Sequence, residues 1–143
     1  MVKCLKSGKV VVILSGKYAG KKAVIVKVFE EGNGKYKFPH ALVCGVARPP
    51  RKVTRRMNEK KVNKKTTMQV FTKVINLQHF MPTRYNVEFD FSELPKNAVD
   101  PEQKKAALQK IAKTFQHSYL HQNENEKERT KAGVAYLFKK LYF

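Results

Sequence analysis

Short apolar segments, separated by glycine-rich or polar turns, occupy the first two thirds of the chain. Residues 10–14 are five consecutive apolar residues, mostly β-branched, and this run predicts a strand that is buried on both faces. We expect four further strands, over residues 23–28, 38–46, 68–77 and 85–91. A turn at residues 81–84 should precede the last of them. Five short strands with tight connections favour a small β-barrel.

The apolar pattern changes to helical spacing in the last third of the chain. Asp100 and Pro101 have the composition of a helix start, with proline at the first helical position. An apolar stripe then follows at helical spacing: Ala107, Leu108, Ile111, Ala112, Phe115 and Tyr119. Residues 123–129 can hold a second short helix, and the aromatic segment 135–143 predicts a docked tail.

These patterns predict an α+β fold that is mainly β. Residues 1–92 should form the barrel, and residues 93–143 a C-terminal helical extension with a docked aromatic tail. Within the first part, Pro49 and Pro50 end the third strand, since proline removes ladder donors. Residues 51–65 are basic with few apolar side chains, so they cannot order by burial alone. We expect a basic arm over residues 48–66 that orders on binding; a solvated helix over 57–65 is the alternative.

The charge is large and lies mostly in the first part. The chain has 30 Lys and Arg against 11 Asp and Glu, a formal net charge of +19. Residues 1–87 hold 20 of the basic residues and only three acids, whereas residues 88–143 hold 10 and 8. Such a charge destabilises a compact chain unless a polyanion neutralises it, and nucleic acid does so with release of counterions. The alternative is a solvated basic surface without a partner. Solubility alone needs a net charge of only about 2 to 8 in magnitude, so this alternative does not account for +19.

A glycine-rich connection between the first two predicted strands presents several of these charges. Gly16 and Gly20 allow the backbone to turn sharply. Lys17, Lys21 and Lys22 then project from a loop between two strands, where they can reach phosphates. The intervening Tyr18 can either pack on the barrel or stack on a base or ribose.

Residues 8–26 resemble a KOW motif. They contain a glycine before an apolar strand, a Gly-x-aromatic-x-Gly turn, a basic residue and Ala-x-Val. The resemblance extends to the family of eukaryotic large-subunit ribosomal protein 27, most specifically through His79-Phe80-Met81-Pro82-Thr83-Arg84-Tyr85. It covers residues 1–90 well and is looser beyond them, where Tyr142 stands in place of the family's arginine.

The resemblance implies an SH3-like barrel and a structural role in the large (60S) subunit of the cytosolic ribosome. Its expected partners are ribosomal RNA and neighbouring large-subunit proteins, with no membrane and no small-molecule substrate. The protein is then expected in the cytoplasm, with nucleolar transit during assembly. The candidate RNA-binding residues are Lys3, Lys6, Lys9, Lys17, Tyr18, Lys21, Lys22, Arg48, Arg51, Lys52, Arg55, Arg56, Lys60, Lys61, Lys64, Lys65 and Arg84. A KOW regulator that binds RNA polymerase or a nascent transcript is the alternative.

The sequence contains no recognised enzyme motif, no cofactor-binding motif and no membrane-spanning run. The chain has no phosphate-binding Gly-x-x-x-x-Gly-Lys loop and no His-Glu-x-x-His, so we expect no enzyme, metal or cofactor. His117 and His121 could hold a metal on one helix face, but a solvated helix end is favoured. Cys4 and Cys44 should be free thiols that pack as small apolar groups. No apolar run reaches the roughly 18 residues of a membrane span, and no signal peptide is expected.

Overall fold

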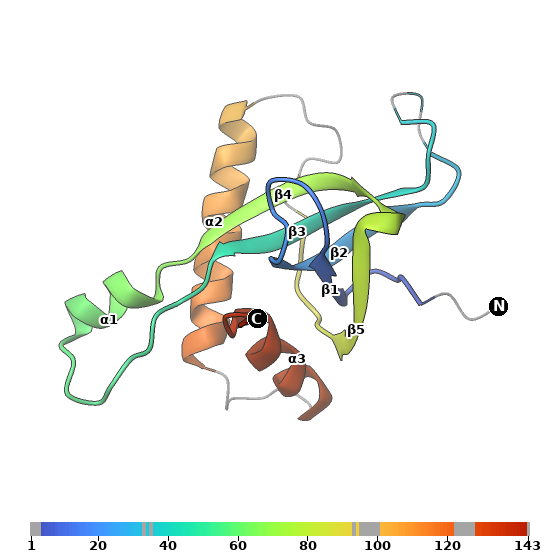
Figure 1. Cartoon of the computed structure of the whole chain (residues 1–143). Coiled ribbons are helices and arrows are strands. Elements are labelled where there is room, and N and C mark those ends of the chain that lie inside the picture. Colours follow the sequence, from blue (N-terminus) through green and yellow to red (C-terminus); the bar gives the residue numbers. More distant parts are fainter. Residues whose placement is uncertain are drawn as a thin grey trace.

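A five-stranded sheet and three α-helices make up the described parts of the computed structural model, which are residues 4–32, 34, 36–92, 94, 101–121 and 128–142. The elements, in chain order, are β1 (Lys9–Ile13), β2 (Lys22–Phe29), β3 (His40–Arg48), α1 (Glu59–Thr66), β4 (Gln69–Asn76), the 3-10 helix η1 (Leu77–His79), β5 (Phe80–Asn86), α2 (Pro101–Leu120) and α3 (Glu128–Phe138) (Figure 1). The predicted α+β class is therefore confirmed, as are the first four strands to within two or three residues.

The strands form one antiparallel sheet in the order β4-β3-β2-β1-β5. Val11 pairs with Ala23, and Ile25 pairs with Val43. Within the described residues β4 and β5 are the outer strands and do not pair with each other. The sheet is open, so the expected closed SH3-like barrel is not confirmed.

The connection between β4 and β5 nevertheless forces the sheet to curl. In a flat sheet, the two outer strands of five lie about 19 Å apart, since neighbouring strands are spaced by about 4.8 Å. Only the three residues of η1 separate β4 from β5. A 3-10 helix advances the chain by only about 2 Å per residue. The two edges of the sheet must therefore approach each other around η1, although no ladder closes them.

The curl gives the sheet an inner and an outer hydrophobic cluster. The inner cluster includes Ile25, Phe71 of β4 and Phe80 of β5, with Leu77 of η1 packed against it, and no residue of α1, α2 or α3. The outer cluster joins Val10 and Val24 to the helices, whose buried residues include Ala107, Ile111, Phe115, Val134 and Leu137. The predicted burial of the first strand on both faces is confirmed for residues 10–13, which are all buried, but it was wrong for Leu14, which lies beyond β1 and is 55% exposed.

The position of the fifth strand differs from the prediction. β5 begins at Phe80, so residues 81–84 lie within a strand and form no turn, while residues 87–91 lie beyond it. Pro82 pairs with Val11, and an edge strand tolerates a proline because one side of it needs no ladder donor. The turn is made earlier, by η1, where the Asn76 side chain accepts a hydrogen bond from the Gln78 backbone N–H at 3.0 Å.

The C-terminal segment is more helical than expected. The expected helix over 123–129 lies mostly outside the described residues, and α3 instead takes in much of the predicted tail. Gly133 brings α3 against β5, since a Cβ there would lie 2.5 Å from the Asn86 carbonyl oxygen. Leu137 is buried, which confirms docking, but Tyr142 is 77% exposed.

The two cysteines differ in burial. Both are free, and Cys44 is buried in the outer cluster as expected. Burial raises the pKa of the Cys44 thiol to about 12, so it stays protonated and unreactive at neutral pH. Cys4 is exposed, so the expectation that both thiols are packed was wrong for it.

Gly45 should be required for the inner cluster. A Cβ at this position of β3, which lies between β4 and β2 in the sheet, would lie 2.6 Å from the Phe71 ring and 2.8 Å from the Ala23 Cβ. We expect Gly45→Ala to lower the free energy of unfolding by about 1–3 kcal/mol, measured by urea denaturation. Gly34→Ala is the control, because a Cβ there meets nothing within 4 Å. Equal losses in the two variants would contradict the packing argument.

Candidate nucleic-acid interface

The basic arm leaves the sheet between β3 and β4 and is closed at its base. The Arg51 N–H donates a hydrogen bond of 3.0 Å to the Lys65 carbonyl oxygen, which joins the two ends of the loop. Between them, α1 lies away from the sheet (Figure 1). The helix that was the alternative to a disordered arm is therefore present, over Glu59–Thr66.

Helix α1 is anchored to α2 through the Gln116 side-chain amide, which donates to the Thr66 hydroxyl and, at 3.4 Å, to the Asn63 carbonyl oxygen. Thr66 is fully buried, and its hydroxyl donates to the Val62 carbonyl oxygen at 3.0 Å. The same hydroxyl accepts a hydrogen bond of 2.8 Å from the Gln116 side-chain amide of α2. Met68, two residues later, is only 4% exposed and belongs to the outer cluster. The arm therefore has an ordered base, because its last residues pack into the fold.

The arm carries nine cationic side chains and a single acid, Glu59, at the start of α1. The nine are Arg48, Arg51, Lys52, Arg55, Arg56, Lys60, Lys61, Lys64 and Lys65. Eight of them are exposed and Lys65 is half-buried. This concentration of charge on a small projecting element is a favourable surface for RNA phosphates.

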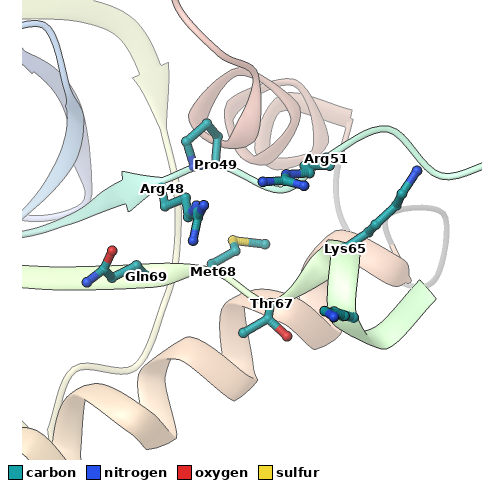
Figure 2. Close-up of a pocket in the computed structure, with 8 residues that line it drawn as sticks. Arg48, Pro49, Arg51, Lys65, Thr67, Met68 and Gln69 are labelled. Carbon is teal, nitrogen blue, oxygen red and sulfur yellow. The ribbon is translucent and has the colours of Figure 1, made fainter. Parts of the chain in front are cut away.

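A hollow of about 620 Å³ lies at the base of the arm (Figure 2). We call it the arm-base hollow, and its lining residues are Arg48, Pro49, Arg51, Lys64, Lys65, Thr67, Met68 and Gln69. The lining residues come from the two ends of the arm and from residues 67–69 directly after it, and the hydrogen bond from Arg51 to Lys65 brings these segments together.

The candidate RNA-binding residues outside the arm lie in several places along the first part of the chain. Lys6, Lys17, Lys21 and Arg84 are exposed and Lys9 is half-buried, whereas Lys3 lies outside the described residues. The Arg84 guanidinium donates to the Tyr85 hydroxyl at 3.1 Å. As expected, Gly16 and Gly20 have positive φ, at 89° and 75°, and shape the turn that presents Lys17 and Lys21.

Tyr18 packs on the sheet. Its ring is stacked on the Phe71 ring, with centroids 3.8 Å apart and an interplanar angle of 3°. Of the two alternatives for Tyr18, the structure shows the packing contact. The ring packs against the inner cluster, to which α1, α2 and α3 contribute no residue.

Lys22 is turned into the protein, away from the exposed turn. It is 5% exposed, and its Nζ donates hydrogen bonds to the carbonyl oxygens of Tyr136 at 2.7 Å and Lys139 at 2.6 Å. The Nζ also lies 3.9 Å from the centroid of the Tyr136 ring. A lysine ammonium here satisfies backbone carbonyls at the end of α3, which helix geometry leaves without partners.

The folded chain also places basic residues at the interface that the sequence did not single out. A second hollow, of about 200 Å³, is lined by Lys21, Lys139 and Lys140 among others, and it shares Pro49 with the arm-base hollow. The end of α3 therefore extends the basic surface of the arm. No local pattern identifies these two lysines, because their position depends on how α3 docks.

The described residues give no support for metal or membrane chemistry. His117 of α2 and His121, directly after its end, have ring centroids 4.4 Å apart, but no group of three or more metal-ligating side chains is found among the described residues. No helix among the described residues is long and apolar enough to cross a membrane. The basic surface formed by the arm, with Lys21, Lys139 and Lys140 beside it, is therefore the candidate interface of the described structure.

The buried position of Lys22 should make folding depend on pH. Burial, with a smaller contribution from the charge of Lys139, lowers the pKa of Lys22 from 10.5 to about 8. Between these values the unfolded chain keeps a proton that the folded chain has released, so stability rises with pH. We expect the free energy of unfolding to rise by about 1–2 kcal/mol over this range relative to Lys22→Met, after allowance for solvent screening.

Urea denaturation at a series of pH values measures this difference. Lys21→Met, at the exposed neighbour, is the control and should keep the wild-type pH dependence. If wild type and Lys22→Met show the same dependence on pH between pH 8 and 10.5, the pKa of Lys22 is not lowered and its burial is not as the structure indicates.

Comparison with known proteins identifies the family. Residues 10–141 match the model of the Ribosomal L27e protein family. The chain is 44% identical to large ribosomal subunit protein eL27 of Tetrahymena thermophila over the full length of both proteins. It is 50% identical to eL27 of Pyrobotrys stellatus over 79% of this chain and 84% of that protein, and 40% identical to eL27 of Candida albicans over both full lengths. The chain therefore belongs to the ribosomal L27e protein family, a family of ribosomal proteins and not of enzymes.

Proposed function

We propose that this protein is a structural constituent of the large subunit of the cytosolic ribosome and that it binds ribosomal RNA through its basic loops and arm. The observation that carries the proposal is the arm itself, with nine cations and one acid on a closed, anchored element. The names of the relatives, all large-subunit proteins, support the same assignment. Neighbouring large-subunit proteins, cytoplasmic localisation and nucleolar transit during assembly belong to this proposal.

The anchored base of the arm favours binding energetically. Its last residues are ordered through Thr66, Gln116 and Met68, so that part need not be ordered when RNA arrives. Less conformational entropy is then lost on association. The exposed cations of the 15–21 turn and the end of α3 extend the contact. Lys22 contributes to the fold and stands outside the proposed RNA surface.

The alternative role, a regulator that binds RNA polymerase, has no observation in its favour. A KOW motif occurs in both classes of protein, so the motif does not distinguish them. The family match over residues 10–141 favours the ribosome.

Fractionation of a cell lysate tests the assignment directly. We expect this protein to remain with the large subunit, at about one copy per particle, in a sucrose gradient at roughly half-molar salt. Contacts made by many phosphates at once, together with burial among other subunit components, would retain it there. Mass spectrometry of the fractions gives the measurement. Migration as a free protein, or with RNA polymerase, would contradict the ribosomal role.

The salt dependence of RNA binding tests the arm. If about ten phosphates are neutralised, the log–log plot of affinity against salt should have a slope between about −7 and −9. The triple variant Arg51→Gln, Lys64→Gln and Lys65→Gln should make the slope shallower by about 2 to 3. Fluorescence anisotropy with a ribosomal RNA fragment gives both values.

A matched loss of charge outside the arm is the control. Lys104→Gln, Lys105→Gln and Lys113→Gln remove three positive charges from α2, which lies in the part of the chain with nearly balanced charge. This variant should keep the wild-type slope. A wild-type slope near −2, or equal effects of the two triple variants, would contradict binding through the arm.

A further inference from the structure

We propose that the arm-base hollow binds one unpaired nucleotide of RNA, with its phosphate between the cationic side chains and its base against the apolar part of the lining. This inference rests on the proposed function, because it names the kind of RNA feature that the arm recognises. An unpaired nucleotide, at a bulge, loop or end, can be turned out of a helix, whereas a paired base cannot enter a hollow in a protein.

The size of the hollow exceeds what a phosphate alone requires. Its volume of about 620 Å³ lies within the range of about 300–1,000 Å³ that is typical of pockets for whole organic ligands. Phosphates on the outside of a regular RNA helix are contacted by projecting side chains and need no enclosing space. The volume therefore favours a ligand that includes a base and a sugar.

The charge of the hollow requires an anion. Two arginines and two lysines are among its lining residues, and none of the lining residues is acidic. The side chains of Arg48 and Arg51 point towards each other from either side, with Met68 between them (Figure 2). Like charges that converge in this way repel each other, and a phosphate between them removes the repulsion. An arginine also offers two parallel hydrogen bonds to a phosphate, and its flat face can stack on a base.

The rest of the lining fits the other parts of a nucleotide. Pro49 and Met68 supply apolar atoms against which a base can pack. Thr67 and Gln69 supply a hydroxyl and an amide that can donate and accept hydrogen bonds at a base edge or a ribose hydroxyl. A site for inorganic phosphate alone would have no use for these four residues.

The hollow is also held in shape without a ligand. The hydrogen bond from Arg51 to Lys65 joins its two walls. Thr66, bonded to Gln116, fixes the wall that α1 provides, and buried Met68 fixes the floor. Little reorganisation is then needed on binding, which is the condition for selective recognition of one nucleotide.

The experiment compares two RNA hairpins that differ by one nucleotide. One is fully paired in its stem, and the other carries a single bulged 2-aminopurine in the same stem. We expect the whole protein to bind the bulged hairpin about tenfold more tightly at equal salt, measured by anisotropy. The fluorescence of the bulged 2-aminopurine should change on binding, because its environment changes from solvent to the hollow.

A charge-preserving variant separates the hollow from general phosphate binding. Arg48→Lys with Arg51→Lys keeps the charge but loses the two flat guanidinium groups. It should bind both hairpins equally and keep the wild-type salt slope. Arg55→Lys with Arg56→Lys, at exposed positions of the arm outside the lining, is the matched control and should keep the preference.

The possible failures are distinguishable. If wild type binds both hairpins equally with a steep salt slope, the nucleotide site is wrong and the proposed function stands. If wild type binds both weakly with a slope near −2, the proposed function fails and the nucleotide site with it. A preference that survives Arg48→Lys with Arg51→Lys, but is lost in the Arg55 and Arg56 control, would place the recognition elsewhere on the arm.

Discussion

The short connection between the two outer strands is the constraint on which the rest of the structure depends. β4 and β5 are neighbours in sequence but opposite edges of the sheet, and η1 provides only three residues between them. The sheet therefore curls, and residues of both edge strands meet in one inner cluster. No residue of α1, α2 or α3 packs on that cluster, because the curl, Leu77 of η1 and the ring of Tyr18 enclose it. The outer face then remains available for α2 and α3, and the helices in turn anchor the arm.

A lysine links the beginning of the fold to its end. Lys22 of β2 holds the last turn of α3 through two backbone carbonyl oxygens, more than a hundred residues away in sequence. Burial lowers the pKa of Lys22, so the ammonium there costs free energy that the carbonyls and the Tyr136 ring offset only in part. Its neighbour Lys21 is exposed and faces the second hollow. Two adjacent lysines of one basic turn thus have different roles, one within the fold and one on the surface.

The sequence predicted those features that depend on local pattern. Buried strands such as residues 10–13, the glycine turn and the apolar stripe of α2 follow from periodicity and backbone freedom, and the structure confirms them. β5 was misplaced because Pro82 is typical of a turn unless the strand is known to lie at an edge, which is a property of the whole sheet. Likewise, the direction of the Lys22 side chain and the position of Lys139 both depend on where α3 docks. The residues next to them in the sequence do not determine that docking.

The arm shows how a strongly basic segment can be ordered at its base without its ligand. Charge repulsion and a shortage of apolar side chains argue against folding of residues 51–65 in isolation. Contacts outside the segment stabilise it instead. These are the hydrogen bond from Gln116 to Thr66 and the burial of Met68. Thr66 is the last residue of α1 and Met68 follows it directly before β4, so the stabilising contacts are remote from most of the charges. Order is therefore provided by the fold, while the exposed cations remain free to meet phosphates.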